Sequence, residues 1–76
     1  MYELNMRKIK NAIIKHNEGI KDFEIEEILS ISLYEEDEEV VVDFSFSMNG
    51  KHFNNGWQRL TFNELNITYY HEDSIE

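Results

Sequence analysis

The chain of 76 residues contains no cysteine and no proline, and it has only three glycines. Without cysteine it can form neither a disulfide nor a thiolate metal site. Without proline, the edge strands of any sheet have to be protected from unwanted pairing by charge. The glycines stand far apart, which excludes a glycine-rich phosphate-binding loop. A chain this short buries only about 60% of its unfolded surface, so it has little stability to spare.

Long apolar runs are also missing. No segment approaches the roughly 20 apolar residues that cross a bilayer, and the first twenty residues mix charged and apolar side chains, unlike a signal peptide. We therefore expect a cytoplasmic protein. The apolar fraction of 41% is sufficient for a single domain with one core.

Positive charge is absent from one long stretch. Residues 22–50 contain ten carboxylates and no Lys, Arg or His, in a chain whose net charge is −9. Residues 1–21 carry five basic and two acidic side chains. An acidic surface of this kind repels phosphate, so we expect no direct binding to nucleic acid and none to membranes.

A helix is predicted over residues 2–17. Its apolar residues recur at 3.6-residue spacing and form one stripe. The stripe comprises Tyr2, Met6, Ile9, Ala12 and Ile13. Gly19 follows, and its position predicts a left-handed cap at the end of the helix.

Two segments, 23–34 and 39–48, alternate apolar and polar residues and predict antiparallel strands joined by an acidic turn. A short helix over 22–28 is the alternative for the start of the first segment. If Leu33 faces Val40, the register is fixed for the whole hairpin. The pairs expected from it are Ile31–Val42, Ser30–Asp43, Leu29–Phe44 and Glu27–Phe46.

The third strand is predicted over 57–70, with a break at 63–64. The break is either a bulge in one long strand or a tight turn before a fourth strand. Asn49-Gly50 predicts a two-residue hairpin turn, with one loop over 49–56 as the alternative. The tail, 71–76, is expected to fray. The predicted fold is α+β, in the order α-β-β-β: one helix packed on one face of a three-stranded or four-stranded antiparallel β-meander.

No catalytic, cofactor or metal site is expected. His16, His52 and His71 stand in three separate elements, without ligand spacing. Glu27 is the one carboxylate expected on an apolar strand face, and acid–base catalysis by it with a histidine would need a pocket. We therefore expect a protein that is not an enzyme.

The acidic stretch is the feature that points to a partner. Solubility and edge protection explain any single carboxylate, but their concentration favours docking onto a basic protein surface, which nucleic-acid-binding proteins present. Exposed aromatic residues are common interface anchors, although Trp57 could instead cover one end of the core. The candidate partner-binding residues are Asp22, Glu24, Glu26, Glu35, Glu36, Asp37, Glu38, Glu39, Asp43, Trp57 and Tyr70.

In size, acidity and helix-plus-small-sheet layout, the whole chain resembles small inhibitors encoded by bacteriophages and mobile elements. These include anti-CRISPR proteins, nucleic-acid mimics and nuclease-immunity proteins. The resemblance implies a binding protein that blocks a host nucleic-acid-handling protein. The alternative is a regulatory or assembly subunit, or a homodimer, that binds through apolar residues while the acids serve solubility. Its binding residues would be Leu4, Ile14, Trp57 and Tyr70.

Overall fold

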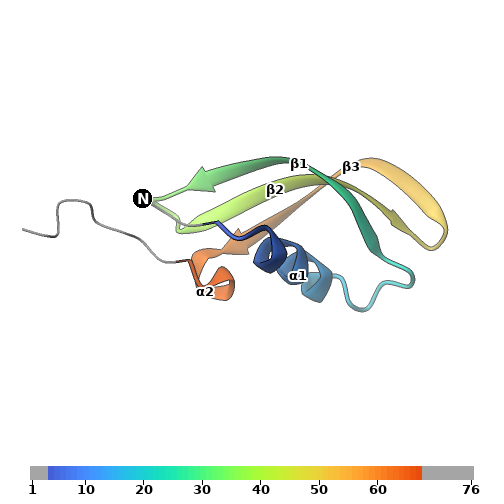
Figure 1. The fold of residues 1–76 in the computed structure, drawn as a ribbon, viewed down its shortest axis with the longest axis horizontal. Helices are drawn as coiled ribbons and strands as arrows, with labels where there is room; N and C mark the ends of the chain where they lie inside the picture. Colours follow the sequence, from blue (N-terminus) through green and yellow to red (C-terminus); the bar gives the residue numbers. More distant parts are fainter. Residues whose placement is uncertain (1–3, 68–76) are drawn as a thin grey trace, which may run out of the picture.

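The structure is a computed structural model that describes residues 4–67. The elements in chain order are α1 (Met6–His16), β1 (Glu24–Tyr34), β2 (Glu39–Met48), β3 (Lys51–Thr61) and α2 (Phe62–Leu65). The strands form one antiparallel sheet in the order β1-β2-β3 (Figure 1). The predicted α+β fold with a helix followed by three antiparallel strands is confirmed, and a short second helix follows it.

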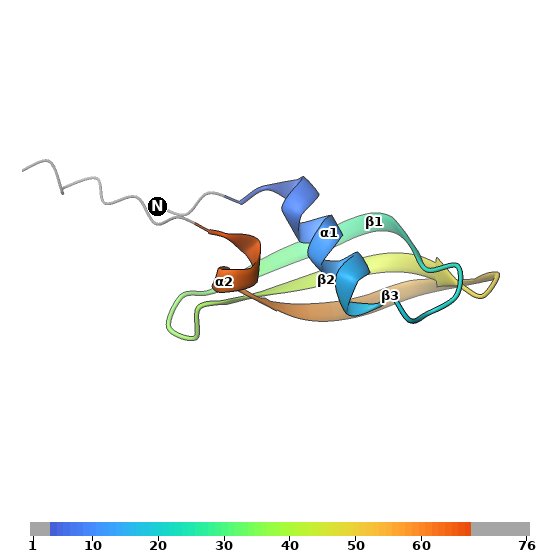
Figure 2. The same ribbon diagram turned by 90° about the horizontal axis from the view of Figure 1, so that it is seen from below.

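The two helices lie on the same face of the sheet, as Figures 1 and 2 show from two directions. We call this the inner face. No element within residues 4–67 covers the opposite face, which we call the outer face. The sheet therefore forms one layer of a two-layer structure. Its inner face packs on the core, and its outer face is in contact with water.

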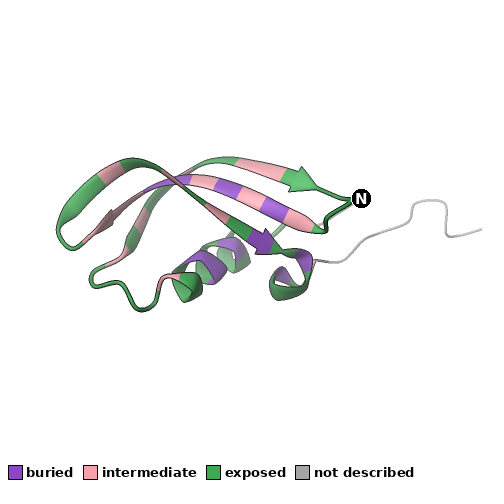
Figure 3. Cartoon of the chain, turned by 180° about the vertical axis from the view of Figure 1, so that it is seen from behind, coloured by how far each residue is buried: buried purple, intermediate pink, exposed green. Residues whose placement is uncertain are grey.

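The core lies between the helices and the inner face (Figure 3). Its buried residues are Ile9, Ala12, Ile13, Val40, Val42, Phe44, Leu60, Phe62 and Leu65. Three of these alternate along β2, because side chains of a strand point to opposite faces in turn. Burying one such aliphatic or aromatic side chain stabilises the fold by about 1.5–3 kcal/mol.

Helix α1 begins later than the sequence predicts. Asn5 is the N-cap, and its side chain accepts a hydrogen bond from the backbone N–H of Lys8 at 3.1 Å. Met6 is exposed although it belongs to the predicted stripe, and Tyr2 lies outside the described residues. The helix ends at Asn17, whose φ is −119°, so the predicted left-handed cap at Gly19 is wrong.

The register of β1 and β2 is as predicted next to their turn. Leu33 faces Val40, Ile31 faces Val42 and Ser30 faces Asp43. Beyond Ser30 the expected register is wrong, because bulges lie between Ile28 and Ser30 and between Ile25 and Glu27.

The bulges bring a different set of β1 residues to the core. Ile28 and Ile25 face Phe44 and Phe46, and both pack against the core together with Ile31. These isoleucines are three residues apart, whereas residues on one face of a regular strand are two apart. Each bulge inserts the one extra residue that keeps the isoleucines on the same face. Leu29, expected opposite Phe44, is instead 48% exposed.

Strands β2 and β3 are joined by the two-residue turn Asn49-Gly50. Both residues have positive φ, 55° and 79°, which is the conformation of a type I′ hairpin turn. The N–H of Asn49 donates to the carbonyl of Lys21 at 3.0 Å, which ties the turn to the connection before β1. The third strand therefore starts at Lys51 rather than at Trp57, and the predicted alternative of one loop over 49–56 is wrong.

Strand β3 ends at Thr61, so the predicted continuation to residue 70 with a bulge or turn at 63–64 is wrong. Residues 63 and 64 lie inside α2. Thr61 and Glu64 form a capping box: the Glu64 N–H donates to Thr61 Oγ1 and the Thr61 N–H donates to Glu64 Oε2. The helix then closes at Asn66, which has a φ of 52°. The proposed fourth strand from 65 to 70 is absent from residues 65–67, and the rest of it, like the tail 71–76, lies outside the described residues.

Strand β3 also carries a bulge, where Asn54 and Asn55 together stand opposite Ser45. Beside it, the Phe46 ring stacks on Phe53 with centroids 5.0 Å apart and also contacts two further rings, those of Phe44 and Phe23. Gly56 lies under this ring, since a Cβ added there would stand 2.5 Å from Phe46 Cε1. A glycine is thus required for the close approach of strand and ring.

Gly56→Ala should therefore destabilise the protein. The Phe46 ring is held by three other rings, so the added methyl group forces overpacking, which costs about 1–3 kcal/mol in the free energy of unfolding. Gly19→Ala is the matched control, because nothing lies within 4 Å of its added Cβ and its φ is not positive. Urea denaturation should show the control unchanged or up to about 1 kcal/mol more stable. Equal effects of the two substitutions would contradict the packing argument.

Candidate protein-binding surface

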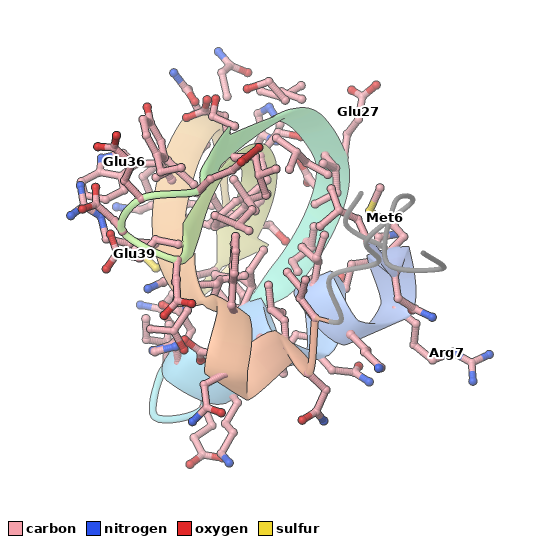
Figure 4. The ribbon with its side chains drawn as sticks, turned by 90° about the vertical axis from the view of Figure 1, so that its left-hand side faces the viewer. Met6, Arg7, Glu27, Glu36 and Glu39 are labelled. Atoms are coloured by element: carbon pink, nitrogen blue, oxygen red, sulfur yellow. The ribbon has the colours of Figure 1, made fainter. Side chains whose placement is uncertain are left out.

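The β1–β2 turn presents four consecutive carboxylates, Glu35 to Glu38, and all four residues are exposed. The turn is held by its backbone. The N–H of Glu38 donates to the carbonyl of Glu35 at 3.1 Å, and Glu38 has a φ of 54°. The carbonyl of Glu38 accepts from the N–H of Phe62 at 2.9 Å, which anchors the turn to the start of α2. The backbone that carries these charges is therefore anchored by hydrogen bonds, and Figure 4 shows Glu36 at this turn.

The carboxylates of β1 are not arranged as an even row. Asp22 precedes the strand in a turn, with a φ of 56°, and Glu26 lies at a bulge. Simple strand alternation from residue 22 predicts that Asp22, Glu24 and Glu26 project from one face, and this prediction is wrong. Glu27 is exposed, projects away from the sheet (Figure 4) and pairs with Ser45, so the expected position on the apolar face is also wrong.

Three of the ten carboxylates between residues 22 and 50 have a side-chain partner. His52 Nδ1 of β3 lies 2.5 Å from Glu26 Oε1 of β1, so this pair reaches across the central strand. Arg59 Nη1 lies 3.4 Å from Glu39 Oε1. Ser30 Oγ donates to Asp43 Oδ2 at 2.7 Å.

The other seven carboxylates form no ion pair or side-chain hydrogen bond with any residue that the structure describes. These seven are Asp22, Glu24, Glu27, Glu35, Glu36, Asp37 and Glu38. All of them are exposed.

The partners His52 and Arg59 are absent from the set of candidate residues chosen from the sequence. The hairpin turn Asn49-Gly50 is a signal for His52, because it places that residue opposite Ser47. It is not a signal for Arg59, since the turn alone would set Leu60 opposite Glu39. Only the bulge opposite Ser45 brings Arg59 to the same face as Glu39.

Trp57 lies on the outer face, opposite Asp43, and is 64% exposed. It therefore does not cover the end of the core, which was the alternative to an interface role. Asp43 is half-buried in the central strand, between Ser30 on one side and Trp57 on the other. Tyr70, the second aromatic candidate, lies outside the described residues.

The basic side chains gather on a different part of the molecule. Arg7, Lys8, Lys10 and Lys15 all belong to α1, and all are exposed without a carboxylate partner among residues 4–67. Figure 4 shows Arg7 on the opposite side of the domain from Glu36 and Glu39. The fold therefore separates an acidic sheet and turn from a basic helix.

Comparisons of the chain with protein-family models, curated proteins and solved structures find no match.

A search of residues 4–67 finds no group of three His, Cys, Asp or Glu side chains that could hold a metal ion. Neither helix in this part of the chain has the length and apolar character needed to cross a membrane. The candidate site is therefore a surface formed by the charged side chains of the sheet and the β1–β2 turn. Ser45 is the one polar residue in the described range whose side chain is buried.

A groove of about 540 Å³ lies between α1 and α2, on the inner side of the domain. Lys8, Lys15, His16, Glu18 and Glu64 contribute to its lining. His16 Nε2 lies 2.7 Å from Glu64 Oε1 and links the two helices. Burial raises the pKa of the Glu64 carboxyl, but hydrogen bonds from Thr61 and His16, with the charge of His16, outweigh it and hold the pKa below its ordinary value.

This lowered pKa makes the stability of the α2 end dependent on pH. A carboxyl with a depressed folded-state pKa contributes stability that is present above its unfolded value, about 4.5, and is lost as pH falls through the folded value. Glu64→Gln keeps a capping acceptor but removes the charge. The unfolding free energy of the natural protein should exceed that of Glu64→Gln at pH 6, and the difference should shrink toward pH 3.

Glu18→Gln is the matched control, because Glu18 lines the same groove but its side chain has no partner within residues 4–67. Denaturation at several pH values measures both variants. A difference between the natural protein and Glu64→Gln that stays constant from pH 6 to pH 3 would show that the charge of Glu64 does not stabilise the fold.

Proposed function

We propose that the protein is a small non-enzymatic binding protein that docks its acidic β1–β2 hairpin onto a basic surface of a nucleic-acid-handling protein and blocks it. The observation that carries the proposal is the set of seven exposed carboxylates without side-chain partners among residues 4–67, four of which stand on one turn. A surface that carries this much uncompensated negative charge resembles the phosphate backbone that such a partner is built to hold. Complementary charge would accelerate the encounter and select the partner.

The rigidity of the turn supports this function. Its carbonyl at Glu38 accepts a hydrogen bond from the start of α2, so the backbone that carries the four carboxylates does not have to be ordered when a partner binds. Binding then loses less conformational entropy than docking of a flexible acidic tail would. An inhibitor encoded by a phage or mobile element, of the anti-CRISPR or nucleic-acid-mimic kind, is the biological role that we propose for it.

A second candidate is a regulatory or assembly subunit, including a homodimer, that binds through apolar surface. The observation that favours it is the number of large apolar or aromatic side chains left exposed within residues 4–67. These are Leu4, Met6, Ile14, Ile20, Leu29, Leu33, Tyr34 and Trp57. Exposed apolar side chains are common on single domains, however, and these are spread over both helix and sheet.

The two candidates differ in their dependence on charge. If the acidic hairpin docks, reversing Glu36 and Asp37 to Lys should lower the affinity for basic nucleic-acid-binding proteins captured from a bacterial lysate at least tenfold. Raising salt from about 0.1 M to 1 M should have a similar effect, because screening shortens the reach of the charges from about 10 Å to 3 Å. Affinity is measured by titration of each captured protein after purification.

Glu18→Lys is the control for charge reversal, since Glu18 is exposed but lies beside the helices. It should retain nearly all the affinity. Binding that is indifferent to salt and to reversal at the turn would contradict electrostatic docking and favour the apolar alternative.

A further inference from the structure

The outer face of the sheet pairs its carboxylates with basic side chains from β3 at two levels. Toward the Asn49-Gly50 turn, His52 reaches over β2 to Glu26. Toward the β1–β2 turn, Arg59 pairs with Glu39. Both basic side chains come from the same edge strand. Glu39 stands on the same face as Asp43, and Glu26 lies at a bulge beside that face.

The level between them lacks a cation. Asp43 occupies the central strand there, and the β3 residue opposite it is Trp57. Arg59, the nearest outer-face cation along β3, is engaged with Glu39. The Asp43 carboxylate accepts a hydrogen bond from Ser30 and has no ion pair with any described cation.

Asp43 is also less exposed than the carboxylates of the turn. It is half-buried, so its negative charge is less screened by water than that of Glu36 or Asp37. A cation placed beside it would interact more strongly than one beside a fully exposed carboxylate. The neighbouring Trp57 ring is 64% exposed, and its edge-strand position makes it accessible.

We propose that Asp43 and Trp57 together form the binding position for one arginine side chain of the protein partner. This inference rests on the proposed function, and it names the group that the acidic surface recognises. A guanidinium ion is planar, so it can stack on the indole ring while its N–H groups donate to the Asp43 carboxylate. A lysine ammonium ion lacks the flat surface and the forked donors, so it fits this position less well.

The position completes the pattern of the outer face. With an arginine in place, each of the three levels of the face would have one basic side chain beside a carboxylate. Ser30 holds the Asp43 carboxylate by a 2.7 Å hydrogen bond, so the acceptor is oriented before the arginine arrives. The carboxylates of the β1–β2 turn would then attract the basic partner through their electrostatic field.

The test uses the full chain with an oligoarginine peptide and an oligolysine peptide of equal length at low salt. Trp57 is the only tryptophan, so its fluorescence reports directly on contact with the peptide, and calorimetry gives affinities for every variant. We expect oligoarginine to bind about tenfold more tightly than oligolysine and to change the Trp57 emission. Asp43→Asn and Trp57→Ala should each lower the affinity for oligoarginine at least tenfold and remove the preference over oligolysine.

Matched controls separate this position from general charge and general aromatic surface. Glu18→Gln removes one exposed charge away from the sheet, and Tyr34→Ala removes another exposed ring. Each should change the affinity about twofold or less. Trp57→Phe keeps an aromatic surface and should retain a partial preference for arginine, which also guards against a folding defect in Trp57→Ala.

The outcomes distinguish this inference from the function on which it rests. If Asp43→Asn and Trp57→Ala bind like their controls, or if oligolysine binds as tightly as oligoarginine, the arginine position is overturned. Salt-dependent binding that is weakened by charge reversal at the β1–β2 turn would in that case still support the acidic docking surface. If neither peptide binds at low salt, both the arginine position and electrostatic docking are overturned.

Discussion

The structure depends on one constraint, which is that the helices of residues 4–67 cover only one face of a three-stranded sheet. Every buried apolar residue has to come from the inner face or from the two helices. The central strand therefore carries the fold, because Val40, Val42 and Phe44 are the inner-face residues flanked by a strand on either side. The short helix α2 closes one end of this core with Phe62 and Leu65. Little redundancy remains, as expected for so small a core.

The same constraint makes the outer face available for charge. Residues that alternate with the core residues of β2 must point to water, and Asp43 is one of them. The face is stabilised by contacts between strands, from His52 to Glu26, from Arg59 to Glu39 and from Ser30 to Asp43. Such half-exposed pairs contribute little stability each, so they do not offset the repulsion among the unpaired carboxylates.

The sequence predicts the layers, the strand order and the register near the β1–β2 turn, because strict alternation around Leu33 and Val40 permits only one pairing. The prediction from sequence fails where the apolar residues do not repeat at a regular strand spacing. Isoleucines three residues apart fit a strand only with bulges, and strand alternation has no way to indicate a bulge. At the end of β3, alternating Leu65 and Ile67 suggested a strand, although Thr61 and Glu64 carried the signature of a capping box.

One part of the candidate surface could likewise be predicted from the sequence, and another part could not. The exposure of the acidic turn is predictable, since four consecutive carboxylates cannot be buried. The partners of Glu26 and Glu39, which are His52 and Arg59, could not be predicted. Their positions depend on where β3 begins and on its bulge opposite Ser45. Edge protection, the simplest explanation of the acids, accounts for those on β1 but not for those of the turn or for Asp43 in the central strand. Strand β3 is also an edge, but it carries Lys51 and Arg59 and no carboxylate, so protection of edges by acids is confined to β1.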